Sequence, residues 1–166
     1  MRGPDQHPDT ELLDQLRAGL LAARSRGRFE VHPGQPTWVF DVAHNPQAAQ
    51  MLDASLADLF VHGSRIAVCG MLDDKDAEGI VAPLDEHVDL WVALPADSPR
   101  AIPAGELARR IANATNRPCL IATSLPDALQ AARREASEGD RILVAGSFYV
   151  VGPALQALGL YSPPKS

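Results

Sequence analysis

The chain has 166 residues, 46% of them apolar, which is the length of one ordinary domain and enough apolar material for a single core. Its formal net charge of -6 argues against binding to nucleic acid or to an anionic membrane surface, because both favour a basic protein face. Small molecules and other proteins remain as candidate partners.

Apolar residues recur at helical spacing in some segments and form short unbroken runs in others. The Pro-Gly-Gln-Pro sequence at 33–36 predicts a turn that pairs its two flanking strands as a hairpin. In chain order, we expect a helix within residues 1–26, strands over 29–32 and 37–40, and then helices with apolar stripes over 48–59, 77–84, 104–111, 125–132 and 151–158, separated by strands over 66–69, 90–93, 119–122 and 142–145.

Short apolar strands that alternate with amphipathic helices predict a parallel sheet covered on both faces. We therefore expect an α/β fold: a three-layer αβα, Rossmann-like domain with about six strands, mostly parallel, and one antiparallel edge strand from the hairpin. Ser124 and Asp127 have the spacing of a capping box at the start of one helix. Trp38 and Trp91 lie in strand patterns and are expected in the core.

The two cysteines and five histidines give no metal-binding pattern. Cys69 and Cys119 lie fifty residues apart in runs that look like buried strands, so we expect two free thiols and no zinc site. No stretch approaches about 18 consecutive apolar residues, and the first residues lack the features of a signal peptide. We expect a soluble protein of the cytoplasm.

Three strand ends carry residues that suit ligand binding. The segment 41–46 reads D-V-A-H-N-P, the segment 69–76 reads C-G-M-L-D-D-K-D, and the segment 145–149 reads A-G-S-F-Y. In open α/β sheets, ligands bind where the carboxyl ends of parallel strands meet, so these loops are expected to line one cleft. A simpler interpretation is that Asp41 and Asn45 only cap the next helix, with Pro46 in its first position.

Five motifs in this order resemble the C-terminal domain of bacterial folylpolyglutamate synthase, often bifunctional with dihydrofolate synthase, in the Mur ligase superfamily. They are G-R-F-E, D-V-A-H-N-P, G-M-L-D-D-K-D, S-P-R and A-G-S-F-Y-V-V-G, and the resemblance runs from about residue 27 to residue 158. It implies an N-terminal helix and linker over 1–26 and a Mur-ligase-type C-terminal domain over 27–160, and the terminal residues 161–166 are expected to form a loose tail. It also implies a partner domain, because no G-x-x-x-x-G-K-[ST] phosphate loop occurs in the chain.

Enzymes of this family use ATP to convert a substrate carboxylate to an acyl phosphate, which the amine of L-glutamate attacks to form an amide. The resemblance implies that this domain holds ATP through Arg28, Asp41, His44 and Asn45, with Asp41 on the ribose and Arg28 on phosphate. It places His44, Lys75 and Ser147 near glutamate. No residue is expected to act as a nucleophile, so catalysis depends on positioning and charge.

The resemblance further implies that most magnesium ligands and the pterin site belong to the N-terminal P-loop domain. The partners are then that domain, ATP, L-glutamate and dihydropteroate or a reduced folate; the protein is expected to be a monomer, and this domain alone is expected to be inactive. For Lys75, pairing with its acidic neighbours is the alternative, and Arg100 has no assigned role. A Mur-type peptidoglycan-precursor ligase and a non-catalytic nucleotide-binding module are alternative functions, and the residues do not decide between one and both folate reactions.

Overall fold

In the computed structural model, residues 27–161 are described. The helix expected within residues 1–26 and residues 162–166 of the expected tail lie outside them. Tyr161 is partly buried against the core, and its backbone N–H donates to the carbonyl oxygen of Leu155 at 3.2 Å. Within residues 27–161, no helix is both long and apolar enough to cross a lipid bilayer.

The sheet has six strands in the order β1-β2-β6-β3-β4-β5. The strand β1 runs antiparallel to β2 and forms the expected hairpin, while all other neighbours are parallel, so the prediction of a mostly parallel sheet with one antiparallel edge strand is confirmed. The strands are β1 (Glu30–His32), β2 (Thr37–Asp41), β3 (Arg65–Cys69), β4 (Leu90–Ala93), β5 (Cys119–Ile121) and β6 (Arg141–Ala145).

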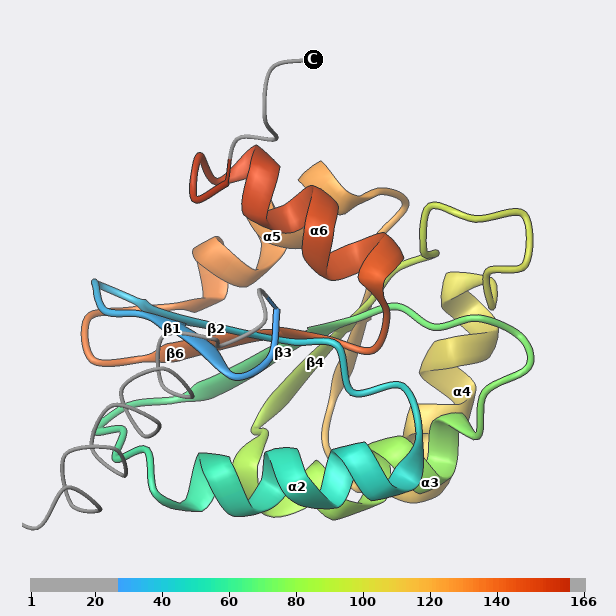
Figure 1. Cartoon of the computed structure of the whole chain (residues 1–166), viewed down its shortest axis with the longest axis horizontal. Helices are drawn as coiled ribbons and strands as arrows, with labels where there is room; N and C mark the ends of the chain where they lie inside the picture. The colour runs from blue at the N-terminus through green and yellow to red at the C-terminus, as the bar shows by residue number, and fades with distance from the viewer. Residues whose placement is uncertain (1–26, 162–166) are drawn as a thin grey trace, which may run out of the picture.

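Helices cover both faces of the sheet, which confirms the three-layer αβα prediction (Figure 1). One face carries α2, α3 and α4, and the other carries α5 and α6. The helices are α2 (Pro46–Ala57), α3 (Ala77–Val81), the 3-10 helix η1 (Ala82–His87), α4 (Ala104–Ala114), α5 (Leu125–Glu135) and α6 (Phe148–Ala157).

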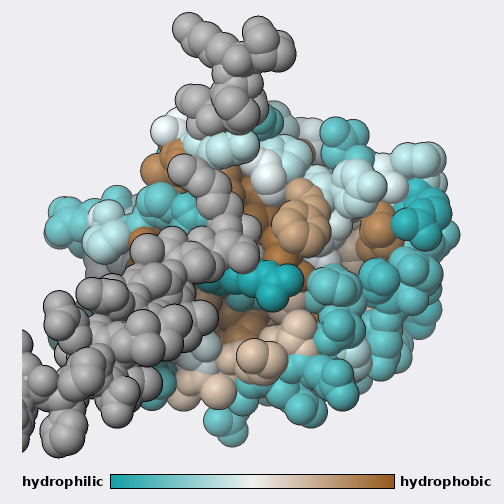
Figure 2. All heavy atoms as spheres, in the orientation of Figure 1, coloured by the Kyte–Doolittle hydropathy of each residue, from teal (hydrophilic) through white to brown (hydrophobic). Residues whose placement is uncertain are grey.

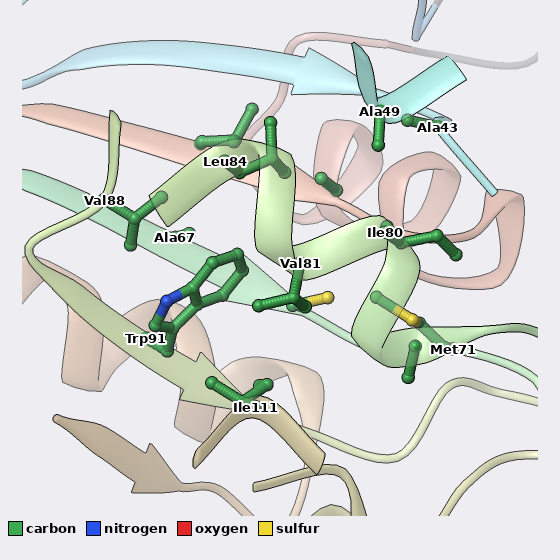
Figure 3. Packing of buried hydrophobic residues seen from close by; sticks show 14 of the residues in the cluster. Ala43, Ala49, Ala67, Met71, Ile80, Val81, Leu84, Val88, Trp91 and Ile111 are labelled. Carbon is green, nitrogen blue, oxygen red and sulfur yellow. The ribbon is translucent and has the colours of Figure 1, made fainter. Parts of the chain in front are cut away.

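Each face of the sheet has its own hydrophobic core, because successive strand residues point to opposite faces. On β6, Leu143 belongs to the core under α2, α3 and α4, whereas Val144 belongs to the core under α5 and α6. Figure 3 shows the first of these cores, in which Trp91 packs among Leu84, Val88 and Ile111 and their neighbours. Trp38 is buried in the second core, so both tryptophans are core residues as predicted.

Two expectations about single elements were wrong. The stripe over 77–84 is buried, but it is split between α3 and η1, with Pro83 in the first turn of η1, where its missing N–H has no helical partner to lose. The strand with Cys119 was expected to be buried. It is an edge strand instead, where Cys119 is half-buried and Ile121 is 61% exposed.

The capping box at α5 forms only in part. Ser124 is the N-cap, and its Oγ accepts from the backbone N–H of Asp127 at 3.3 Å. In a capping box, the second bond would run from the backbone N–H of Ser124 to the Asp127 carboxylate. Here the Asp127 carboxylate accepts instead from the backbone N–H and the hydroxyl of Thr123, at 3.3 and 2.7 Å. The helix start predicted from the spacing is therefore correct, while one of its two bonds is shifted by a residue.

Candidate functional site

The three candidate loops begin at one edge of the sheet. In the register of the parallel strands, Asp41 at the end of β2 lies opposite Ala145 at the end of β6, and Ala145 lies opposite Cys69 at the end of β3. The loops that follow these residues therefore leave the sheet at its carboxyl edge, on the right in Figure 1. This is the edge at which open parallel sheets bind ligands.

Asp41 joins two turns through its carboxylate. Its Oδ2 accepts from the backbone N–H of Phe29 at 2.8 Å, and its Oδ1 accepts from the backbone N–H of Ala43 at 2.7 Å. Burial raises the pKa of Asp41 above its ordinary value, and this effect exceeds the opposite one of the two N–H bonds and of the Arg28 charge. The interpretation of Asp41 as a helix cap is wrong, since neither bond reaches the first turn of α2.

Asn45 is the N-cap of α2. Its backbone is extended, and its Oδ1 accepts from the backbone N–H of Ala48 at 2.8 Å, while Pro46 occupies the first turn. This confirms the cap predicted for Asn45. Beside it, Nδ1 of His44 lies 3.0 Å from the carbonyl oxygen of Val42, and a proton on Nδ1 would complete that bond and leave Nε2 as an acceptor.

A tight turn over residues 27–29 carries Arg28 to the same place. Gly27 has a φ of 74° and Phe29 a φ of 44°, the left-handed region that non-glycine residues rarely adopt. The turn is tied to β2 by the bond to Asp41 and by the N–H of Val42, which donates to the carbonyl oxygen of Gly27 at 2.7 Å. Backbone strain of this kind persists only where surrounding bonds hold it.

These residues line an open hollow of about 390 Å³, here called the α2 hollow. Its polar side is formed by the two turns and its apolar side by one face of α2 from Ala48 to Ser55. Figure 2 shows apolar surface bordered by hydrophilic side chains in the band between α6 above and α2 below. The lining residues are Arg28, Phe29, Asp41, Val42, Ala43, His44, Asn45, Ala48, Met51, Leu52 and Ser55.

The apolar side of this hollow was not predicted from the sequence. Met51 is 74% exposed, and it lines the hollow together with Ala48 and Ser55. The signal was present, because 48, 51, 52 and 55 share one helix face with the capping residue Asn45. The spacing of Met51 from Asn45 could have indicated that this methionine lies next to the motif, whereas its exposure is known only from the structure.

Ser147 and Lys75 do not line the α2 hollow. Ser147 is buried as the N-cap of α6, where its Oγ accepts from the backbone N–H of Tyr149 at 3.1 Å, and α6 covers the opposite face of the sheet from α2. Nζ of Lys75 lies 3.2 Å from Oδ2 of Asp74, so it pairs with its acidic neighbour. The guanidinium of Arg100 also approaches this carboxylate, at 3.9 Å.

The site residues divide between the α2 hollow on one face of the sheet and two other loops at the same edge, so the expectation that all three loops line one cleft is wrong for this hollow. Arg28 supplies a permanent positive charge, Asp41 a carboxylate with unused lone pairs and His44 a free ring nitrogen. Within residues 27–161, no group of three or more His, Cys, Asp or Glu side chains is arranged to hold a metal ion. The hollow is therefore suited to a ligand with an anionic group, hydrogen-bonding groups and an apolar part.

Known proteins share this sequence and fold. The model of the family "Mur ligase, glutamate ligase domain" matches residues 27–148. The dihydrofolate synthase/folylpolyglutamate synthase of Escherichia coli is 36% identical over 143 residues, which are 86% of this chain and 33% of that protein. This chain thus spans about a third of the length of this relative and of the one from Mycobacterium tuberculosis, and 17% of two longer archaeal relatives.

Two solved structures are similar as well. The structure of Escherichia coli FolC in complex with DHPP and ADP superposes with a TM-score of 0.80 at 34% identity, over 89% of this chain and 34% of that one. A bifunctional folylpolyglutamate synthase/dihydrofolate synthase with Mn, AMPPNP and L-glutamate bound gives a TM-score of 0.77 at 39% identity, over 87% of this chain and 34% of that one. The family match covers most of the chain, and the chain therefore belongs to the Mur ligase family as a glutamate ligase domain.

Proposed function

We propose that this chain is the C-terminal domain of an ATP-dependent folate:L-glutamate ligase, a folylpolyglutamate synthase that is also a dihydrofolate synthase. The observation that carries the proposal is the α2 hollow, which gathers Arg28, Asp41, His44 and Asn45 on a chain that matches one third of such enzymes. The relatives in complex with ADP or AMPPNP support a nucleotide as the ligand of this hollow.

The reaction joins a carboxylate to an amine. A carboxylate oxygen of the folate attacks the γ-phosphorus of ATP, and ADP leaves with the electrons of the broken P–O bond. The amine of L-glutamate then attacks the acyl phosphate, so that the new C–N bond replaces the C–O bond and phosphate leaves, while the amine loses a proton. Both steps build up negative charge on phosphate oxygens, so a positioned guanidinium favours them.

In this scheme, Arg28 binds phosphate oxygens of ATP and Asp41 binds the ribose hydroxyls. Each carboxylate oxygen of Asp41 already accepts one N–H, at 2.8 and 2.7 Å, and each keeps a second lone-pair direction for a hydroxyl. The bond from Phe29 also fixes the backbone next to Arg28. Asn45 and His44 then face the base or the incoming glutamate from the start of α2.

Glutamate would be bound at the loops beside the hollow. Ser147 and the N-terminal turn of α6 offer backbone donors to a carboxylate, although its hydroxyl already accepts from Tyr149. Lys75 can serve only if its amine leaves Asp74, since the two are ion-paired at 3.2 Å. We therefore rank Ser147 and His44 above Lys75 as glutamate contacts.

The remaining parts of the site belong to the rest of the proposed enzyme. A P-loop domain N-terminal to residues 27–160, joined through residues 1–26, would hold the triphosphate, the folate and most ligands of the magnesium ion. The bound metal would neutralise phosphate charge. The whole enzyme is proposed to be a monomer of the cytoplasm.

The test is a chimera in which this chain replaces the matched C-terminal third of the Escherichia coli relative. The chimera should consume ATP and add L-glutamate to dihydropteroate or a reduced folate, whereas this chain alone should show no turnover. Arg28→Ala in the chimera should raise the KM for ATP about tenfold or more, because a charge-assisted bond to phosphate is lost. Arg109→Ala removes an equal charge from the exposed face of α4 and should change little.

Two results would contradict the proposal. One is folate-dependent ATP hydrolysis by this chain alone. The other is a folded chimera that is inactive with folates or that joins an amino acid to a peptidoglycan precursor, the outcome expected for a Mur-type ligase.

A further inference from the structure

The strand β1 carries two side chains to which the proposed function gives no role. Glu30, the last residue of the G-R-F-E motif, and His32 follow the turn that presents Arg28. They share one side of the strand, and the ring of His32 packs edge-on against Phe40, in the core under α5 and α6, at a centroid distance of 5.7 Å. Val31 between them packs against the core on the other face.

The carboxylate of Glu30 has a partner on each oxygen. Its Oε2 accepts from the backbone N–H of Gly27 at 2.9 Å, and its Oε1 lies 2.8 Å from Nε2 of His32. The side chain of Glu30 is 21% exposed and that of His32 29%. Because an ionised carboxylate can only accept, Nε2 of His32 carries the proton of their bond. His32 therefore orients Glu30, and Glu30 holds the backbone of Gly27.

The turn over residues 27–29 depends on such bonds because its backbone is strained. Gly27 and Phe29 both have a positive φ, and a Cβ on Gly27 would lie only 3.0 Å from Cγ1 of Val151 in α6. Strained backbone persists only where its surroundings hold it. The bonds to the end of β2 hold the N–H of Phe29 and the carbonyl oxygen of Gly27. Glu30 adds a bond to the N–H of Gly27.

We propose that Glu30 is a positioning residue for Arg28 and that His32 acts through Glu30. The backbone is then fixed on both sides of Arg28, by Glu30 at Gly27 and by Asp41 at the residue that follows Arg28. Arg28 is exposed, and a fixed backbone reduces the conformational entropy that is lost when its guanidinium binds a ligand. The identity of that ligand, a phosphate group of ATP, rests on the proposed function, whereas the ordering of the turn does not.

Two matched substitutions isolate the bond between Glu30 and Gly27. Glu30→Gln and Glu30→Leu both remove the charge at similar volume, but only glutamine keeps an acceptor for the N–H of Gly27. In the chimera with the Escherichia coli relative, the KM for ATP should be about three- to tenfold higher in Glu30→Leu than in Glu30→Gln, because one hydrogen bond that orders the turn is lost. The KM for the folate should be the same in both.

A double-mutant cycle separates positioning from a general effect on the fold. In the Arg28→Ala background, the KM values for ATP of Glu30→Leu and Glu30→Gln should differ by less than about twofold, because the residue through which Glu30 acts is absent. A residue that only stabilised the domain would give the same ratio in both backgrounds.

The order of the turn is measured in this chain without the rest of the enzyme. The ¹H–¹⁵N nuclear Overhauser effect of the Arg28 amide reports fast backbone motion, and it should be lower in Glu30→Leu than in the wild type and in Glu30→Gln. His32→Phe keeps a ring against Phe40 and removes the donor to Glu30, so it should lower this value by a smaller amount. Glu138→Leu and Glu138→Gln change an exposed residue after α5 and should both match the wild type.

Three results would overturn the positioning role. They are an equal Arg28 amide value in Glu30→Leu and Glu30→Gln, an equal KM for ATP in the two chimeras, and an unchanged ratio of the two KM values in the Arg28→Ala background. If Glu30→Leu does not fold, His32→Phe compared with the wild type replaces it in each measurement. A wild-type chimera that is inactive contradicts the proposed function alone, and the Arg28 amide then decides this inference.

Discussion

Gly146, at the turn between β6 and α6, should be intolerant of any side chain. Its φ is 110°, and a Cβ built on it would lie 2.6 Å from the carbonyl oxygen of Gly70 and 3.1 Å from Sγ of Cys69. The first contact is with backbone at the end of β3, so relief requires the two strand ends to move apart. Gly146→Ala therefore combines a disfavoured backbone conformation with overpacking at the carboxyl edge.

The size of the effect follows from these two causes. A non-glycine residue in a sparsely populated backbone region costs about 1–3 kcal/mol, and overpacking a filled site costs a further ~1–3 kcal/mol. We expect Gly146→Ala to lower the free energy of unfolding by roughly 2–6 kcal/mol, a large share of the about 5–15 kcal/mol typical of a domain. The measurement is urea unfolding followed by circular dichroism, with the slope compared between variants.

Gly105→Ala is the matched control. Gly105 is exposed in the first turn of α4, and a Cβ there would meet nothing within 4 Å. This change should stabilise the protein by up to about 1 kcal/mol, because alanine loses less backbone entropy in a helix. Wild-type stability of Gly146→Ala, with Gly105→Ala behaving as stated, would refute the close approach of the two strand ends.

Three further predictions concern single side chains. Asn45→Ala should cost about 1 kcal/mol in urea unfolding because the cap of α2 is lost, while Asn45→Asp should retain most of it; equal losses would contradict the cap. The carboxyl of Asp41 should titrate above its ordinary value of 3.8 by ¹³C NMR. The folded state then binds this proton more tightly than the unfolded state, so the contribution of Asp41 to stability falls as the pH rises from 3.8 through the folded pKa. A titration midpoint below 3.8 would contradict this, because stability would then rise with pH over that range. Iodoacetamide at pH 8 should label Cys119 before Cys69, because burial raises the pKa of Cys69 to about 12; faster labelling of Cys69 by mass spectrometry would be incompatible with its burial.

The order of elements could be predicted from the sequence because each apolar pattern has a single period and is bounded by turn or capping residues. Pro36 and Gly34 mark the hairpin, and Asn45 with Pro46 marks the start of α2. The burial of β5 could not be predicted in the same way. An apolar run such as 119–121 has the same appearance in a central and an edge strand, and only the strand order reveals that Ile121 lacks a neighbour on one side.

The candidate site could be predicted only to the level of a sheet edge. Parallel strands bring Asp41 and the loop with Ser147 to that edge, which the alternation of strands and helices already implies. The face to which each loop contributes depends on where its helix packs. Since α2 and α6 cover opposite faces, Asp41 lines the hollow while Ser147 caps a helix elsewhere.

In the motif at 41–46, Asp41 and Asn45 have different structural roles, which the sequence alone does not assign. Both Asp41 and Asn45 have side chains able to cap α2, and the structure gives that bond to Asn45 alone. Asp41 is thereby free to hold the backbone of Phe29 and Ala43, which fixes the turn that presents Arg28. A carboxylate that binds two backbone N–H groups in a partly buried hollow keeps its orientation without a ligand. Under the proposed function, the bonds that shape the turn also orient Asp41 toward a hydroxyl of the nucleotide, so Asp41→Ala is expected to weaken both nucleotide binding and stability.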